Sequence, residues 1–377
     1  MKLTCVGKYL KDAIVVAERN TSKNQTLPVL NSVFLEAKNN DLTIRATNLE
    51  TAVEIKIPCK VELAGITVIS GKILSAFLSQ ISDETIQLQN QKNNLFIKTK
   101  KTQTTLRGYG ADDFPLFPSI ESIFSFSLPS QELRQGLEHV SIAASNSDIK
   151  PELSSICFKI LKNTLKLAAT DSFRLAEKTI LFQKLNTEKS ITLLVPGGSV
   201  LELLRLLDLP KESIVSLGDE KEVSIVSNKN QIIFQNSRIR FISRLTEGSF
   251  PDYEQIIPKN FKAEALIKQK DLINQIKLAS VFVGRLQDII LILQPKNKKL
   301  LFQVSNPDIG EHESELEISV NGEENSAKFN WKYLFDGINH VSTEYVVLGF
   351  NGDQSPLMIK GKGDTSYYYL AMPMRGM

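Results

Sequence analysis

The residues best suited to acid–base or nucleophilic chemistry are few and scattered. The candidates are His139, His312, His340, Cys5, Cys59 and Cys157. A serine or cysteine nucleophile needs a base within hydrogen-bond reach, commonly histidine, and none of the three histidines lies in a recognisable catalytic signature. Two of them, His139 and His340, fall within helical patterns, which indicates ordinary helix-face residues.

Motifs for nucleotide, zinc and calcium binding are also missing from the sequence. There is no G-x-x-x-x-G-K-[ST] loop, no G-x-G-x-x-G after a strand and no H-E-x-x-H. The acidic pairs Asp112-Asp113 and Glu323-Glu324 adjoin turns, and adjacent side chains point in different directions, so neither resembles a two-metal nuclease site. The sequence therefore predicts a protein that is not an enzyme and that requires no cofactor or metal.

Composition places the chain among multi-domain globular proteins. At 377 residues it exceeds what one core usually supports, which suggests two or three domains. The 45 Lys+Arg and 42 Asp+Glu leave a net charge of +3, so any contact with nucleic acid is expected to be local or topological. An odd number of widely spaced cysteines favours a reducing cytoplasm, and no apolar run approaches the length of a membrane span.

The elements that would position any functional residue occur in three copies. Residues 42–57 read LTIRATNLETAVEIKI, residues 165–180 read LKLAATDSFRLAEKTI, and residues 300–319 read LLFQVSNPDIGEHESELEIS. In each copy a strand ends at Asn48, Asp171 or Asn306, and a second alternating strand follows. The spacing of 123 residues from Asn48 to Asp171, and 135 from Asp171 to Asn306, is that of a domain-sized duplication. The short Asx side chains predict turns at these three positions.

Each copy also carries two segments with apolar residues at helical spacing. The first helices are expected near 10–19, 131–144 and 269–282, and the second near 71–81, 198–207 and 331–341. Ser130 and Asn330 stand where N-caps are expected. Phe114-Pro115, Phe250-Pro251 and Met372-Pro373 close the copies, since proline stops a strand. The sequence thus predicts an α+β fold with domains at 1–123, 124–253 and 254–377.

The repeats carry motifs that resemble those of the bacterial replicative sliding clamps, the beta subunits of DNA polymerase III. The resemblance extends over essentially the whole chain, through TLPVLNSVFLEA (26–37), ATNLE (46–50), ADDFP (111–115), AATDSFRLA (168–176), FPDYEQIIP (250–258) and MPMRGM (372–377). It implies a head-to-tail homodimer that forms a closed ring, with helices facing the hole and sheets outside. Retention on DNA would then come from topology and not from base contacts.

The resemblance also implies three groups of functional residues. The family's dimer interface matches 102–107 on one protomer and 269–284 on the other, and includes Thr104, Leu106, Ser280 and Val281. Basic residues on or beside the inner helices would face DNA: Lys11, Arg19, Lys23, Arg134, Lys150, Arg205, Lys277 and Lys332. A pocket between the middle and last domains would bind peptides resembling Gln-Leu-x-Leu-Phe, through Leu153, Thr170, Ser172, Phe173, Arg174, Leu175, Pro251, Gln255, Ile256, Leu286, Asn330, Tyr333, Leu370, Ala371, Met372, Pro373, Met374 and Arg375.

The partners implied are double-stranded DNA, the DNA polymerase III core and other polymerases, an ATP-dependent clamp loader, and mismatch-repair and other proteins with a clamp-binding motif; no membrane partner is implied. The sequence departs from the family pattern at Phe173, Gln255 and Gly376-Met377, and Gly197-Gly198 stands where basic residues are common. Two alternatives stay open. One is a specialised clamp paralogue with other partners, and the other is a DNA-processing enzyme on a repeated scaffold, which would need a catalytic cluster in one copy.

Overall fold

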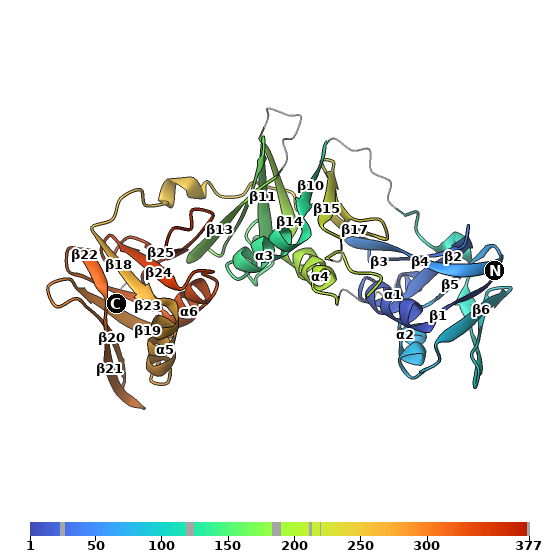
Figure 1. The fold of residues 1–377 in the computed structure, drawn as a ribbon, viewed down its shortest axis with the longest axis horizontal. Coiled ribbons are helices and arrows are strands. Elements are labelled where there is room, and N and C mark those ends of the chain that lie inside the picture. The colour runs from blue at the N-terminus through green and yellow to red at the C-terminus, as the bar shows by residue number, and fades with distance from the viewer. Residues whose placement is uncertain (23–26, 118–123, 183–189, 211–212, 219, 375–377) are drawn as a thin grey trace. The chain divides into compact units, whose positions relative to one another are not determined.

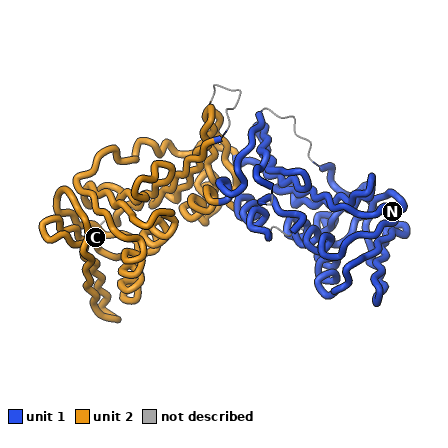
Figure 2. The backbone as a smooth tube through the Cα atoms, in the orientation of Figure 1, with its two compact units in different colours: residues 1–134, 182–186, 198–246 blue, residues 135–181, 187–197, 247–377 orange. Residues whose placement is uncertain are grey.

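The structure, a computed structural model, describes residues 1–22, 27–117, 124–182, 190–210, 213–218 and 220–374. The chain divides into two compact units, coloured separately in Figure 2. Unit 1 comprises residues 1–134, 182–186 and 198–246, and unit 2 comprises residues 135–181, 187–197 and 247–377. The middle predicted domain contributes to both units. The limits predicted at 1–123, 124–253 and 254–377 therefore stay a prediction.

Unit 1 is built on a 13-stranded sheet whose main path runs β10-β15-β16-β17-β4-β1-β6-β7-β8 (Figure 1). Strands β2, β3, β5 and β9 branch from this path through β4. The strands are β1 (Lys2–Val6), β2 (Ser32–Lys38), β3 (Asp41–Thr47), β4 (Thr51–Leu63), β5 (Gly65–Ser70), β6 (Thr85–Gln91), β7 (Asn94–Lys98), β8 (Gln103–Leu106), β9 (Gly108–Tyr109), β10 (Phe124–Pro129), β15 (Glu222–Ser227), β16 (Gln231–Gln235) and β17 (Ile239–Arg244).

Unit 2 contains a nine-stranded sheet, ordered β14-β11-β12-β13-β26-β25-β24-β18-β22, and a four-stranded sheet, ordered β21-β20-β19-β23. The strands are β11 (Ser155–Leu161), β12 (Thr164–Thr170), β13 (Arg174–Leu181), β14 (Ile191–Pro196), β18 (Ala263–Lys268), β19 (Asp288–Gln294), β20 (Lys299–Asn306), β21 (Gly310–Glu317), β22 (Ser319–Gly322), β23 (Asn325–Asn330), β24 (Tyr345–Phe350), β25 (Leu357–Gly361) and β26 (Tyr367–Ala371). The pairings recorded between these strands are antiparallel, as expected for the α+β class.

Six α-helices occur in the described part of the chain, two for each repeat, as the sequence predicted. They are α1 (Gly7–Arg19), α2 (Gly71–Ser79), α3 (Ser130–Ser141), α4 (Gly197–Leu207), α5 (Gln269–Ser280) and α6 (Trp331–Asn339). Short 3-10 turns lie at η1 (Pro28–Asn31), η2 (Ala111–Asp113) and η3 (Tyr253–Ile256). Helix α1 packs beside α2, and α5 beside α6. No helix in the described ranges is long and apolar enough to cross a bilayer.

One of the two predicted helix caps is confirmed and the other is wrong. Asn330 caps α6, because its Oδ1 accepts the backbone N–H of Lys332 at 2.9 Å. Ser130 is instead the first residue of α3, and its hydroxyl donates to the carbonyl oxygen of Glu220 at 2.8 Å. The Ser130 side chain thus makes a tertiary hydrogen bond and does not form the helix cap that the local pattern had predicted.

The three predicted Asx turns are confirmed, and the first two use the same hydrogen bonds. The Oδ1 of Asn48 accepts the N–H of Glu50 at 2.9 Å and that of Thr51 at 2.7 Å. The Oδ1 of Asp171 accepts the two equivalent N–H groups, at 2.9 and 3.0 Å. Asn306 makes the first bond of this kind, at 3.0 Å to the N–H of Asp308. The duplication therefore extends to individual turn contacts.

Within each unit one strand pairing joins a repeat to the next. In unit 1, five residues of β4 pair with β17, from Thr51↔Ser243 to Ile55↔Ile239. In unit 2, five residues of β13 pair with β26, from Arg174↔Ala371 to Lys178↔Tyr367. The two strand pairs occupy equivalent places in the repeats, since β4 and β13 both follow the Asx turn. These pairings explain why the sheets run through the predicted domain boundaries.

Two helical glycines make the packing testable. A Cβ on Gly337 of α6 would collide with the ring of Tyr369, whereas a Cβ on Gly198 of α4 would meet no atom within 4 Å. We expect Gly337→Ala to lower the free energy of unfolding by about 1–3 kcal/mol through overpacking. The matched change Gly198→Ala should leave it unchanged or raise it by up to about 1 kcal/mol, because alanine favours helix. Urea unfolding would measure the free energy of unfolding of both variants. An equal change in the two would contradict the close packing of Gly337 against Tyr369.

Candidate functional site

The second Asx turn, between β12 and β13, carries a polar network centred on Arg174. The Arg174 Nε donates to Asp171 Oδ2 at 2.9 Å, and its Nη1 donates to Asp336 Oδ2 of α6 at 2.7 Å. Its guanidinium also lies over the ring of Tyr333, with Cζ 4.4 Å from the ring centroid. Residues 162 positions apart in the sequence are thereby brought into one cluster.

Charge in this cluster is strongly stabilised. Burial alone would lower the pKa of Arg174, but Tyr369 and Asp171 beside it raise that pKa above its usual value. The guanidinium therefore stays charged and is held in one orientation by two carboxylates and an aromatic ring. Its fixed N–H groups can orient polar groups of a bound chain, and they cannot supply a proton for catalysis.

The paired strands β13 and β26 lie next to this network. Leu175 and its cross-strand partner Leu370 are each 1% exposed. They pack in one apolar cluster with the segment 250–257, which contains η3, through Phe250, Tyr253 and Ile257. The Tyr253 hydroxyl donates to Glu177 Oε2 at 2.6 Å, which fixes this segment to β13. These two leucines were predicted to line the pocket directly. Both are buried in this cluster, and their role in the pocket stays a prediction.

Several of the predicted pocket residues expose apolar surface. Phe173 is 63% exposed, Ile256 48% and Leu286 67%, while Met372, Pro373 and Met374 are half-buried. Ser172 has φ +78°, the left-handed region, and this turn sends Phe173 outward. Phe173, next to Arg174 in the chain, places exposed apolar surface beside a fixed polar group, which is typical of peptide-binding surfaces.

The chain end is tied to both sides of this surface. The N–H of Met372 donates to the carbonyl oxygen of Phe173 at 2.9 Å, and the N–H of Met374 donates to that of Lys328 at 2.7 Å. Lys328 lies on β23, just before the α6 cap Asn330. Of the terminal motif, Arg375 lies outside the described residues. The segment 372–374 is therefore placed between the Asx turn and the start of α6.

Other predicted pocket residues are linked to this surface less directly. Thr170 is buried and its hydroxyl donates to the carbonyl oxygen of Arg174 at 2.6 Å, and Ala371 is buried opposite Arg174 on β26. Leu153 is 7% exposed just before β11. The Gln255 amide donates to Asp252 Oδ2 at 2.6 Å, and Pro251 is exposed beside it. The full set of pocket residues stays a prediction.

Several cations predicted to face DNA are already paired within the chain. The Nε of Arg19 lies 2.9 Å from Glu202 Oε1, and the Nη1 of Arg205 lies 3.1 Å from Glu202 Oε2. Arg134 pairs with Asp208 at 2.8 Å, and the Lys11 ammonium donates to the carbonyl oxygen of Ile81. These contacts offset part of the positive charge expected on the helices.

The remaining predicted cations that the structure describes are exposed. Lys150 and Lys332 lie at the surface of unit 2, and Lys277 lies with its Nζ 5.5 Å from the ring centroid of Phe335. Lys23 falls outside the described residues. Sequence reasoning missed the acidic partner Glu202, and nothing in the local pattern of α4 marked it as buried and doubly paired.

Two of the predicted interface residues lie on an edge strand, and the other two lie at the end of helix α5. Thr104 and Leu106 are half-buried on β8, the last strand of the unit 1 path. Ser280 ends α5, and Val281 after it is 67% exposed. Strand β21 forms the edge of the four-stranded sheet of unit 2. Both edges offer unpaired backbone groups of the kind that a second chain can use.

Two of the three histidines, His139 and His340, lie near each other, and His139 also lies beside an aromatic ring. The His139 ring packs at 4.9 Å from that of Tyr367 and at 6.0 Å from that of His340. Burial, aided by Lys178, lowers the pKa of His139 to about 4. Within the described ranges no three His, Cys, Asp or Glu side chains are grouped to hold a metal ion.

Comparison with known proteins decides the family. Three models of the DNA polymerase III beta subunit match: its N-terminal domain at residues 1–118, its central domain at 127–252 and its C-terminal domain at 254–375. This chain belongs to the bacterial beta sliding clamps. The predicted resemblance and the three-domain α+β fold are thus confirmed.

Full-length relatives agree with this assignment. The chain is 28% identical to the beta sliding clamp of Synechocystis and 25% identical to that of Staphylococcus aureus, each comparison covering 100% of this chain and 99% of the relative. Solved beta subunits from Pseudomonas aeruginosa and Thermotoga maritima are 25% identical over 100% of both chains, with TM-scores of 0.92 and 0.90. A P. aeruginosa clamp bound to griselimycin gives a TM-score of 0.93 at 25% identity over 100% of both chains. Membership of the sliding clamps agrees with the prediction of a protein that is not an enzyme.

The half-buried His139 gives a pH dependence that can be measured. Its neutral form is favoured in the folded clamp, so the unfolded chain takes up the proton first as pH falls below about 6.5. We expect the free energy of unfolding to decline from pH 6.5 toward pH 4, and His139→Gln to reduce that decline. Identical urea-unfolding profiles for parent and His139→Gln would disprove this role.

Proposed function

We propose that this sliding clamp encircles duplex DNA as a head-to-tail homodimer, keeps DNA polymerase III on its template, and binds partner proteins through the surface around Arg174. The observation that carries the ring is the repeated junction between copies. Inside the chain, the strand after the Asx turn pairs with the last strand of the next copy, once as β4–β17 and once as β13–β26. Two equivalent strands keep a free edge.

Those two strands are β21, which follows the third Asx turn, and β8, at the end of the first copy. Within one chain each has a neighbour on one side only. If β21 of one protomer pairs with β8 of the other, the junction between copies occurs a third time and the ring closes. The same contact then forms twice in a dimer, which leaves no unpaired edge of this kind.

Charge supports the pairing of β21 with β8. Strand β21 presents four glutamates on one face, and they are exposed: Glu311, Glu313, Glu315 and Glu317. Strand β8 is flanked by exposed cations: Lys98, Lys100, Lys101 and Arg107. Complementary charge at the two edges favours the heterologous pairing and disfavours β21 pairing with another β21. The exposed Val281 and Leu278 of the α5 end add apolar surface beside that edge.

The docking surface supports partner binding by the mode the family resemblance implies. Arg174, held by Asp171 and Asp336, would orient the polar part of a Gln-Leu-x-Leu-Phe peptide, and Phe173, Met372 and Met374 would contact its leucine and phenylalanine. Polymerases, the clamp loader and mismatch-repair proteins that carry such a motif would share it. Sequence-independent retention on DNA then needs only scattered cations. A clamp that serves replication in this way would act in the cytoplasm.

Dimerisation gives the first test. Leu106→Asp on β8 should place a carboxylate against the glutamates of the partner's β21 strand and shift the protein to monomers, with the dimer dissociation constant raised by at least about tenfold, or ~1.4 kcal/mol. Leu181→Asp, at a 65% exposed position on β13, is the matched control and should remain dimeric. Sedimentation velocity would measure both. A Leu106→Asp protein that stays as dimeric as the control would contradict the proposed interface.

Peptide binding gives the second test. A fluorescent Gln-Leu-x-Leu-Phe peptide should bind the parent saturably, and Phe173→Ala should weaken binding about tenfold, or ~1.4 kcal/mol. Leu181→Ala is matched in exposure and lies on the same strand as the network, so its binding should equal that of the parent. Fluorescence anisotropy reads both. A parent that does not bind the peptide would overturn the docking surface and favour a specialised paralogue with other partners.

A further inference from the structure

Two cysteines lie directly opposite each other on neighbouring strands of unit 1. Cys5 on β1 is the cross-strand partner of Cys59 on β4 in an antiparallel pair. Cys5 lies on the buried face of β1 together with Leu3. Cys59 lies on the less exposed face of β4 together with Ile57 and Val61. Opposed residues of an antiparallel pair point to the same side of the sheet. Both thiols are free.

The pair is of the closely spaced kind. The N–H of Cys59 donates to the carbonyl oxygen of Asn40 at 2.9 Å and is thus not exchanged with Cys5. Opposed residues that do not share hydrogen bonds have Cα atoms about 4.5 Å apart, closer than in hydrogen-bonded pairs. A disulfide needs Cα atoms about 4.4–6.8 Å apart. The backbone therefore already meets the spacing that a bond between the two sulfurs requires.

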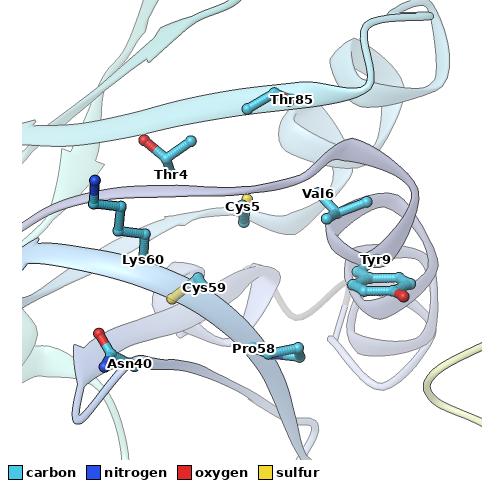
Figure 3. A pocket seen from close by; sticks show the side chains of 9 residues that line it. All are labelled: Thr4, Cys5, Val6, Tyr9, Asn40, Pro58, Cys59, Lys60 and Thr85. Carbon is cyan, nitrogen blue, oxygen red and sulfur yellow. The ribbon is translucent and has the colours of Figure 1, made fainter.

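Small molecules can reach this pair. Both cysteines line an open pocket of about 610 Å³ together with Tyr9, Pro58 and Lys60 (Figure 3). Cys59 is half-buried, whereas Cys5 is 4% exposed. The Cys5 thiol donates to the carbonyl oxygen of Ile86 on β6 at 3.7 Å, so it turns away from Cys59 in the reduced state. A rotation about its Cα–Cβ bond that turns the sulfur toward Cys59 would break this weak contact.

We propose that Cys5 and Cys59 form a cross-strand dithiol that low-molecular-weight disulfides convert into an intramolecular disulfide. The thiolate of Cys59 attacks one sulfur of the small disulfide, which forms a mixed disulfide and releases one small thiol. The thiolate of Cys5 then attacks the Cys59 sulfur, forms the Cys5–Cys59 bond and releases the second small thiol. The two protons lost by the cysteines end on the two released thiols, and the small disulfide is the oxidant.

The order of attack follows from access and acidity. Burial and the neighbouring Cys59 raise the pKa of Cys5 to about 12, while burial and Asp41 raise the pKa of Cys59 to about 11. Cys59 is therefore both the more exposed and the more acidic thiol. Because only thiolates react, the rate should rise about tenfold for each pH unit between 7 and 9. Lys60 at the pocket can attract a small disulfide that carries carboxylates.

The test uses the full-length protein and oxidised glutathione as the probe. After incubation at pH 8.5, peptide mass spectrometry should find a Cys5–Cys59 cross-link, with Cys157 still a free thiol. The midpoint of thermal unfolding should rise by several degrees and return after reduction, because the bond joins β1 to the end of β4. This cross-linking test requires neither dimerisation nor peptide binding, so its outcome does not depend on the proposed function.

Three variants separate the steps. Cys5→Ser should stop at a mixed disulfide between glutathione and Cys59, and Cys59→Ser should form neither product. Cys157→Ser is the matched control and should cross-link like the parent. The proposal is overturned if the parent retains glutathione on Cys59, if Cys157 enters the bond, or if the folded protein keeps all three thiols while the urea-unfolded chain is oxidised.

Discussion

The antiparallel pairing that joins one repeat to the next is the interaction on which the rest of this clamp depends. It occurs as β4–β17 in unit 1 and as β13–β26 in unit 2, with five residue pairs each time. Main-chain hydrogen bonds make it tolerant of side-chain change, which explains how three copies with diverged sequences keep one architecture. The same pairing leaves β8 and β21 as the two free equivalents, and the cations beside β8 and the glutamates of β21 support the proposed addition of a second chain there.

The proposed docking surface also depends on this pairing. Arg174 begins β13, and its cross-strand partner Ala371 ends β26, so the pair brings the Asx turn beside the chain's last described residues. The N–H of Met372 extends the pairing by one bond to the carbonyl oxygen of Phe173. Asp336 of α6 then fixes the guanidinium at 2.7 Å. A site formed by one repeat alone would lack either the turn or the chain end.

Local patterns in the sequence predicted much of the fold and little of the side-chain pairing. The Asx turns and the Asn330 cap were predicted correctly because each is closed by hydrogen bonds within three residues. Leu175 is buried against Tyr253, which packs on it from far along the chain, and no local pattern in the sequence marks that contact. The ion pair of Arg19 with Glu202 joins residues 183 positions apart, and no spacing in the sequence marks such a partner. Family motifs suggested the proposed docking surface, and the fold shows which of its residues are buried and which are exposed.

The proposal that a third copy of the junction closes the ring can be tested directly by hydrogen–deuterium exchange of the β8 and β21 backbone amides as a function of protein concentration. The account predicts that both strands become protected together, over the concentration range in which dimers form, while β4 and β13 are protected throughout. If the dimer forms and the amides of β8 and β21 still exchange freely, the chains associate through another surface, and the ring built from a repeated strand pairing is wrong.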